Sequence, residues 1–186
     1  MKPHPAALPL LAAMLGLGCA TTAPPSYVAT TLRPTLGNTA AGTVWFIADG
    51  AEVRIRGRIS GLTPNQEHGF HVHEKGDCSS GDGMSSGGHL NPTGKPHGPP
   101  GGERHAGDLP ALKADAAGNA TIDSRVRGQP AGPNEFAGKA LIVHLSADDY
   151  TTQPTGNSGA RIACGVIAAA PLLDAGGQVL PLPRDR

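Results

Sequence analysis

The segment Glu52-Val53-Arg54-Ile55-Arg56-Gly57-Arg58-Ile59 alternates apolar with charged side chains. Val53, Ile55 and Ile59 fall on one side of an extended chain and the arginines on the other, because successive strand residues point to opposite faces. One face is therefore expected to be buried and the other wet, as in antiparallel sheets. Asp49-Gly50, directly before the segment, is a hairpin signal.

Working outward from this strand, seven more short segments are rich in strand-forming residues and are bounded by turn residues. They are 27–33, 42–48, 68–74, 109–114, 120–126, 140–145 and 162–169. No helical periodicity of convincing length occurs beyond the N-terminal segment. The pattern predicts an all-β fold, an eight-stranded antiparallel sandwich or barrel with long loops.

Length and charge limit the function classes. The 186 residues suit one domain with a real core rather than two. Fifteen basic and fifteen acidic residues leave no net charge, so a nucleic-acid or anionic-membrane partner has no electrostatic support. We therefore expect no nucleic-acid partner.

The N-terminus reads as an export signal. Lys2 precedes an apolar run, residues 6–17, which is too short to span a bilayer. We expect residues 1–18 to be a signal peptide and residues 19–26 a flexible tether. The folded domain is expected to occupy 27–170, and 171–186 an irregular tail.

Two processing routes are open. Gly16-Leu17-Gly18-Cys19 is similar to a bacterial lipobox, in which Cys19 would carry lipid, although lipoboxes usually have Leu at the position of Gly16. The alternative is ordinary cleavage after Ala20 or Ala23. Both routes predict export to the periplasm or cell envelope. The lipidated form would contact a membrane through this one anchor, and the cleaved form would have no anchor. An oxidising compartment permits a disulfide.

Residues 75–104 form a long segment dense in Gly, Pro and Ser and nearly free of large apolar side chains. Such a loop cannot bury enough surface to offset its ordering entropy, so it is either disordered or functional. It contains Cys78, His89 and His97, and metal bonds or a disulfide are the usual means of ordering such a segment.

The histidines carry the chemistry. His71 and His73 are two apart on a predicted strand, so both imidazoles face one side and can reach one metal. His89, His97 and His105 follow at intervals of eight residues, and Asp108 lies three beyond the last. Three histidines and one aspartate form a closed tetrahedral zinc site.

Several blocks of sequence resemble one known family in order and spacing. The blocks are Gly69-Phe70-His71-Val72-His73-Glu74, Gly88-His89-Leu90-Asn91-Pro92, His105-Ala106-Gly107-Asp108-Leu109, Ile142-Val143-His144 and Gly156-Asn157-Ser158-Gly159-Ala160-Arg161-Ile162-Ala163-Cys164-Gly165-Val166-Ile167. The family is the copper/zinc superoxide dismutases, in their bacterial exported form. The resemblance covers about residues 27–169 and implies an eight-stranded Greek-key, immunoglobulin-like β-fold with metal-binding loops.

The resemblance also implies one copper and one zinc ion per chain. Copper falls on four histidines, namely His71, His73, His89 and His144. Zinc falls on His89, His97, His105 and Asp108, so that His89 bridges the two metals. The implied reaction converts two superoxide anions and two protons to oxygen and hydrogen peroxide.

Four further residues receive roles from the resemblance alone. Cys78 and Cys164 match the family disulfide. Asp148 matches the carboxylate that links a copper-ligand and a zinc-ligand imidazole, and Arg161 matches the arginine that attracts superoxide beside the copper; the resemblance thus makes Arg161 and His89 the catalytic residues.

The resemblance to the family is weakest in the basic residues expected to attract the anionic substrate. Residues 148–159 contain no Lys or Arg, so Lys75, Lys95 and Arg104 are the candidates to attract the anion instead. His68 is expected at the surface, because it lies three residues before His71 and on the opposite strand face. A lower or less salt-sensitive rate is expected.

Two rival functions are weighed. A metal buffer without turnover would lack a copper ligand or Arg161, and both are present. A β-sandwich stabilised by zinc alone would leave His71, His73 and His144 without a role. One chain is compatible with a monomer and with a homodimer.

Overall fold

The computed structural model describes Met1 and residues 27–127, 132–169, 178 and 180–182. The predicted signal peptide, tether and most of the predicted tail lie outside these residues. Nothing in the described part of the chain is a helix long and apolar enough for a membrane span.

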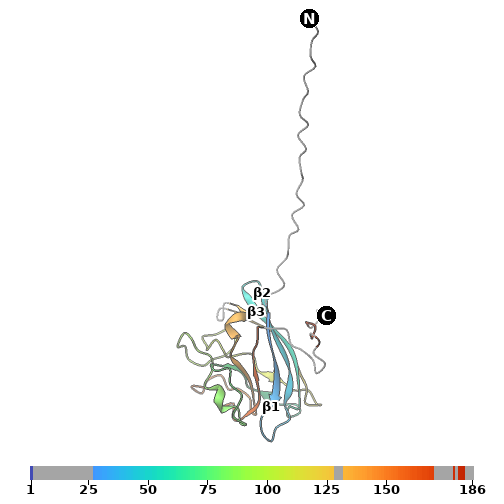
Figure 1. Cartoon of the computed structure of the whole chain (residues 1–186). Coiled ribbons are helices and arrows are strands. Elements are labelled where there is room, and N and C mark those ends of the chain that lie inside the picture. The colour runs from blue at the N-terminus through green and yellow to red at the C-terminus, as the bar shows by residue number, and fades with distance from the viewer. Residues whose placement is uncertain (2–26, 128–131, 170–177, 179, 183–186) are drawn as a thin grey trace.

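The described residues form an antiparallel β-fold with short strands (Figure 1). The strands are β1 (Tyr27–Pro34), β2 (Ala41–Asp49), β3 (Glu52–Ser60), β4 (Glu67–His68), β5 (Phe70–His73), β6 (Leu112–Lys113), β7 (Ala120–Arg127), β8 (Ala140–His144) and β9 (Arg161–Val166). Two 3₁₀ turns, η1 (Met84–Ser86) and η2 (Pro133–Phe136), are the helical elements of the described chain. The all-β prediction is confirmed.

Seven strands make one curled sheet in the order β5-β8-β9-β1-β2-β3-β7, and β4 pairs with β6 separately. β1 joins the two halves, since its first six residues pair with β2 while Arg33 and Pro34 pair with β9. Figure 1 shows β1, β2 and β3 side by side along one flank. Neighbours such as β3 and β7 are distant in sequence, which requires the long crossovers of a Greek key.

The opening segment behaves as predicted on its buried face. Val53, Ile55 and Ile59 are fully buried on β3, and Asp49 pairs with Glu52 across the hairpin turn. On the charged face, Nε and Nη2 of Arg54 each lie 2.9 Å from a carboxylate oxygen of Asp123 on β7. The register is thereby favoured by burial on one face and ion pairing on the other.

Two predicted strands differ from the observed ones. The segment 68–74 is divided at Gly69 into β4 and β5, which pair with different partners. The segment 109–114 contributes only the two-residue β6. Asp108 and Leu109, which precede β6, lie instead along the edge of β5: Asp108 forms a bridge with His71, and Leu109 N donates to Phe70 O.

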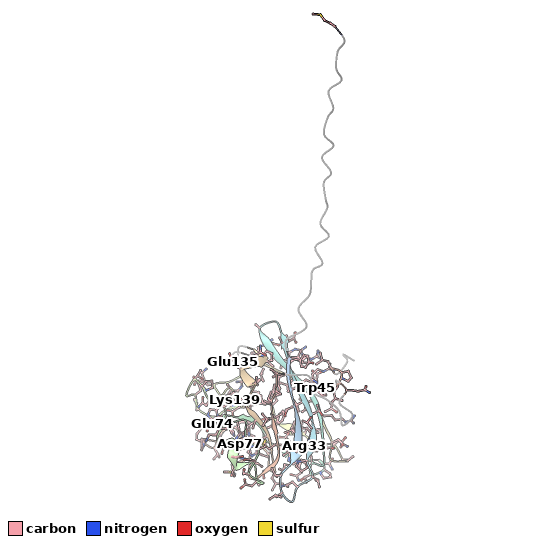
Figure 2. All side chains as sticks on the ribbon, in the orientation of Figure 1. Arg33, Trp45, Glu74, Asp77, Glu135 and Lys139 are labelled. Carbon is pink, nitrogen blue, oxygen red and sulfur yellow. A yellow bond between two sulfur atoms is a disulfide. The ribbon has the colours of Figure 1, made fainter. Side chains whose placement is uncertain are left out.

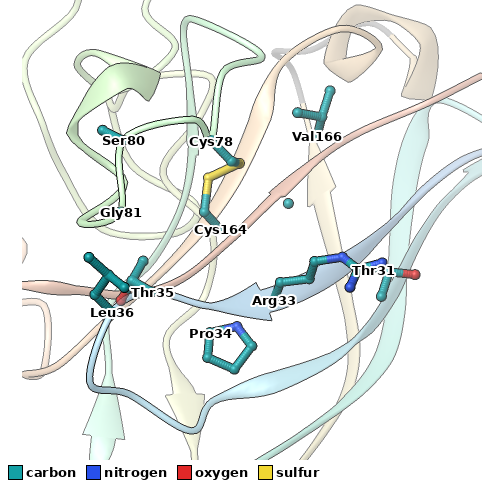
Figure 3. A pocket seen from close by; sticks show the side chains of 11 residues that line it. Thr31, Arg33, Pro34, Thr35, Leu36, Cys78, Ser80, Gly81, Cys164 and Val166 are labelled. Atoms are coloured by element: carbon teal, nitrogen blue, oxygen red, sulfur yellow. A yellow bond between two sulfur atoms is a disulfide. The ribbon is translucent and has the colours of Figure 1, made fainter.

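The long loop 75–104 is tied to the sheet at several points. Leu90 N donates to Val72 O of β5 at 2.8 Å, and Glu74 N, directly after β5, donates to Gly88 O at 2.9 Å. Glu74 O in turn accepts from Lys139 Nζ at 3.0 Å, and Figure 2 places Lys139 and Glu74 on the same flank. Cys78 forms a disulfide with Cys164 of β9, which confirms the expected pairing. Beside the disulfide is a hollow of about 400 Å³, rimmed by Pro34 and Leu36 (Figure 3).

Removing the disulfide should destabilise the protein strongly. Cys78 and Cys164 are 86 positions apart. Closing a loop of that size lowers the conformational entropy of the unfolded chain and so raises its free energy by about 4 kcal/mol. We expect the double variant Cys78→Ala/Cys164→Ala to lose about that much free energy of unfolding, measured by urea denaturation of the metal-free protein. The reduced parent should match the variant, and an unchanged midpoint in both would contradict the prediction.

Candidate metal centre

β5 brings the first two histidines together and receives loops on its free edge. Its whole length is buried, with Phe70 and Val72 in the apolar core and His71 and His73 on the other face. β8 flanks one edge of β5. On the other edge, His71 forms a bridge with Asp108 and His73 forms one with His89. The strand is therefore the place where separate loops meet.

Four histidines converge in a first cluster, as the sequence predicted. The ligand atoms of His71, His73, His89 and His144 lie within 4.8 Å of one another, and all four side chains are buried. In each ring, one nitrogen lacks a hydrogen-bond partner among the described residues. These atoms are His71 Nδ1, His73 Nε2, His89 Nε2 and His144 Nε2.

The opposite ring nitrogens are all held by fixed groups. His73 Nδ1 donates to Gly87 O at 2.9 Å, and His144 Nδ1 donates to Gly159 O at 3.1 Å. His71 Nε2 donates to Asp148 Oδ2 at 2.7 Å. Such bonds fix ring orientation and tautomer, which leaves the four free nitrogens available to one metal ion.

Burial keeps the rings of His71, His73 and His144 uncharged in the metal-free chain. It lowers the pKa of His71 to about 4, of His144 to about 3 and of His73 to about 2. Protonation of neighbouring rings would also be mutually repulsive. At neutral pH each ring therefore offers a lone pair rather than a positive charge, which is the form that binds metal.

A second cluster joins the first through His89. Asp108 Oδ1 lies 2.8 Å from His89 Nδ1 and 3.3 Å from His105 Nδ1. Asp108 Oδ2 lies 3.0 Å from His97 Nδ1. Tetrahedral zinc with bonds of about 2.0–2.1 Å separates its ligand atoms by about 3.3 Å. These spacings fit one zinc ion, with His89 Nδ1 on this side and His89 Nε2 on the other.

The second cluster is strongly ionic. Burial alone would raise the pKa of Asp108, but contacts with His89 and His97 hold that pKa well below its ordinary value. Burial likewise opposes protonation of His97, yet the carboxylates of Asp108 and Asp148 raise the pKa of His97 to about 9. The site thus combines a buried carboxylate with histidines, a donor set suited to a divalent cation.

Asp148 connects the two clusters. Its Oδ2 accepts the His71 bond, and its Oδ1 lies 2.9 Å from His97 Nε2. Tyr150 N also donates to Oδ1, at 2.8 Å. The sequence did not reveal the role of Gly156, where an added Cβ would collide with Asp148 Oδ1. The positive φ of 66° at Gly156 also favours glycine at this position.

Arg161 starts β9 opposite His144 and reaches into the long loop. Its Nη1 donates to Gly83 O at 2.8 Å and to Ser86 Oγ at 2.9 Å. Its Nη2 donates to Gly87 O at 2.7 Å. Gly87 O therefore accepts from both Arg161 and His73. The Gly87-Gly88 pair before His89 was the feature of the sequence that could have indicated this close backbone approach.

Two expectations about other basic residues are wrong. His68 is fully buried rather than at the surface. Arg104 is 7% exposed and donates to the carbonyls of His105 and Arg127, so its cation is enclosed and cannot steer an anion. Lys75 remains exposed and Lys95 partly exposed.

A curled β-fold with two buried, histidine-rich clusters sharing one ring defines a binuclear metalloprotein. A family profile described as copper/zinc superoxide dismutase (SODC) matches residues 40–167. An extracellular superoxide dismutase [Cu-Zn] of Brugia pahangi is 44% identical over 138 residues, covering 68% of each chain. A solved structure described as the clock protein EA4 aligns with a TM-score of 0.69 and 39% identity, over 78% of this chain and 96% of that one.

The chain belongs to the copper/zinc superoxide dismutase family. It is an oxidoreductase that acts on superoxide and uses copper and zinc.

Replacing Asp148 should loosen both clusters at once. In Asp148→Asn, one amide oxygen cannot accept from both His71 and His97, and the NH₂ group would face a ring N–H. We expect zinc affinity to fall about 10- to 100-fold, measured by chelator competition. Asp149→Asn is the control and should keep parental affinity, because Asp149 is exposed and its carboxylate accepts hydrogen bonds from Thr151 and Thr152. Equal affinities in all three proteins would count against the bridge.

Proposed function

We propose that the first cluster holds the copper ion of the dismutase and that the second holds its zinc ion. Copper would be held by His71, His73, His89 and His144, and zinc by His89, His97, His105 and Asp108. The observation that carries this assignment is the set of four buried, unpartnered imidazole nitrogens next to a closed set containing a carboxylate. All-imidazole donors suit a copper ion, and the mixed set suits zinc.

Copper, when bound, supplies the one-electron redox chemistry by which two superoxide anions and two protons become oxygen and hydrogen peroxide. The chain's residues supply the rest. Arg161 is the group that draws in and orients the anion, since its guanidinium carries a fixed charge and shares the Gly87 carbonyl with His73 of the copper set. His89 Nε2, buried and without a partner in the described chain, is the atom we expect to carry a proton during turnover.

The zinc set orders the loops. His97, His105 and Asp108 lie on or just after the long loop, which has few apolar contacts of its own. Asp108 accepts from the backbone N–H of His105 at 3.0 Å and of Gly98 at 3.2 Å. A redox-inert cation at this carboxylate would hold the loop and the orientation of His89 together.

Steering is expected to depend on Arg161 more than on the neighbouring loop. Residues 148–159 contribute Asp148 and Asp149 and no basic side chain. Ionic strength changes the rate through the summed field around the entrance. The reaction should therefore be less sensitive to salt than one guided by several lysines.

The test is the metal content and superoxide consumption of the purified protein, compared with two variants. We expect about one copper and one zinc per chain in the parent. His144→Ala removes one of four copper nitrogens and should lose copper and activity while keeping zinc. Arg161→Gln should keep both metals but lower the rate at subsaturating superoxide about tenfold or more, because a guiding charge has been removed.

The rival functions make different predictions for the same samples. A metal buffer would contain both ions in the parent without consuming superoxide. A zinc-stabilised structural module would contain zinc without copper. Either result would overturn the assignment of the first cluster.

We also propose that the protein is a bacterial exported dismutase, with residues 1–18 as signal peptide, 19–26 as tether, 27–170 as enzyme domain and 171–186 as tail. The Brugia pahangi relative is described as extracellular, which supports export. Lipidation at Cys19 would hold the enzyme on a membrane facing the periplasm, whereas cleavage after Ala20 or Ala23 would release it. Both a monomer and a homodimer are compatible with this proposal.

Changing Cys19 separates the two processing routes. If Cys19 carries lipid, the protein should occur in the membrane fraction with the added mass of acyl chains, and Cys19→Ala should abolish both. Ser26→Ala, in the same segment, is the matched control. A parent protein that is soluble, unacylated and begins after Ala20 or Ala23 would establish ordinary cleavage instead.

A further inference from the structure

His68 is a buried histidine that belongs to neither metal set. It lies on β4, paired with Leu112, and is fully buried. Its Nδ1 is 2.8 Å from the carbonyl oxygen of His144. Its Nε2 is buried and, among the residues that the structure describes, has no hydrogen-bond partner. Because a carbonyl can only accept, the ring carries its proton on Nδ1 and donates it to His144 O.

The acceptor carbonyl lies where the sheet loses its regular register. Val143 pairs with Ala163, but the next residue, His144, pairs with Arg161, so Ile162 is passed over. This is a β-bulge, a feature that bends the chain and changes the direction of nearby side chains. The direction of the His144 ring therefore depends on whatever fixes its backbone at this irregular point.

Residues 68 and 69 hold both backbone groups of His144. The His144 N–H donates to Gly69 O at 2.9 Å, and the His144 carbonyl accepts from the His68 ring. On the other side, the His144 ring donates to Gly159 O. The imidazole thus projects from a peptide held on one side by a backbone bond and on the other by a side chain, and the side chain is the part that mutation can change.

We propose that His68 is a positioning residue for the copper set, acting through the carbonyl of His144 on the direction of His144 Nε2. This inference depends on the proposed assignment of His144 to copper. His68 is not a member of either ligand set, and its Nδ1 reaches the first cluster through the backbone carbonyl of His144. Through His144, it affects the geometry of one copper ligand. Because His144 pairs with Arg161, it also affects the start of β9.

The role of His68 can be tested by variants that replace its two ring nitrogens separately. The amide nitrogen of Asn can occupy the place of Nδ1, whereas that of Gln extends to the place of Nε2, where no described acceptor lies. His68→Asn should therefore restore the bond to His144 O, and His68→Gln and His68→Leu should not. The readouts are the electron paramagnetic resonance spectrum of the protein loaded with cupric ion and the copper dissociation constant from chelator competition.

We expect His68→Gln and His68→Leu to give altered copper hyperfine splitting and a copper dissociation constant raised about 10- to 100-fold. His68→Asn should return both close to parental values, although all three variants lose some thermal stability in the metal-free state. Parental spectra and affinities in Gln and Leu, or equal changes in all three, would overturn the positioning role. If His68→Leu does not fold, the Asn and Gln pair still decides.

The parent protein separates this inference from the proposed function. A parent without bound copper or without superoxide consumption would refute the copper assignment itself. A parent with both, together with unaltered Gln and Leu variants, would refute only the role of His68.

Discussion

The structure depends on one constraint: six imidazoles must be buried together with ring nitrogens still available to bind metal. Buried polar atoms are expensive unless paired, and buried charges more so. The chain meets this by holding ring nitrogens with hydrogen bonds and by keeping the rings of His71, His73 and His144 uncharged through burial, which lowers the pKa of each. Asp148 is central because one carboxylate orients a ring of each cluster.

Because of this constraint, the sheet supplies the stability of the fold and the loops supply part of the metal site. Apolar residues from β1, β2, β3 and β7 stabilise the sheet, with Phe46 packing against Phe136 at a ring separation of 4.8 Å. The loops that complete the site have little apolar surface. They are held by backbone bonds to β5 and by the Cys78–Cys164 disulfide, so their order depends on polar and covalent links to a scaffold that is already stable.

Sequence patterns predicted the parts of this arrangement that obey simple periodicity. Alternation revealed the buried face of β3, and the spacing of His71 and His73 placed both on one face of β5. His68 was misplaced because the strand face opposite His71 was taken to be exposed, whereas Phe70 and Val72 on that face are buried in the core, as is His68 itself. Arg104 was misplaced because no one-dimensional pattern shows that two backbone carbonyls surround its guanidinium. The role of Gly156 depends on a contact with Asp148 across the loop, which only the folded chain reveals.

Metal binding and anion capture are coupled through shared backbone atoms. Gly87 O accepts from His73 and from Arg161, so the position of one loop carbonyl affects a metal-facing ring and the guanidinium together. His144 and Arg161 are likewise paired across the β8–β9 bulge. The disulfide ties this loop to the same strand, three residues beyond Arg161. A displacement of the loop would therefore alter ligand direction and substrate guidance in the same step, which is why a segment with so few apolar contacts must be held by so many specific bonds.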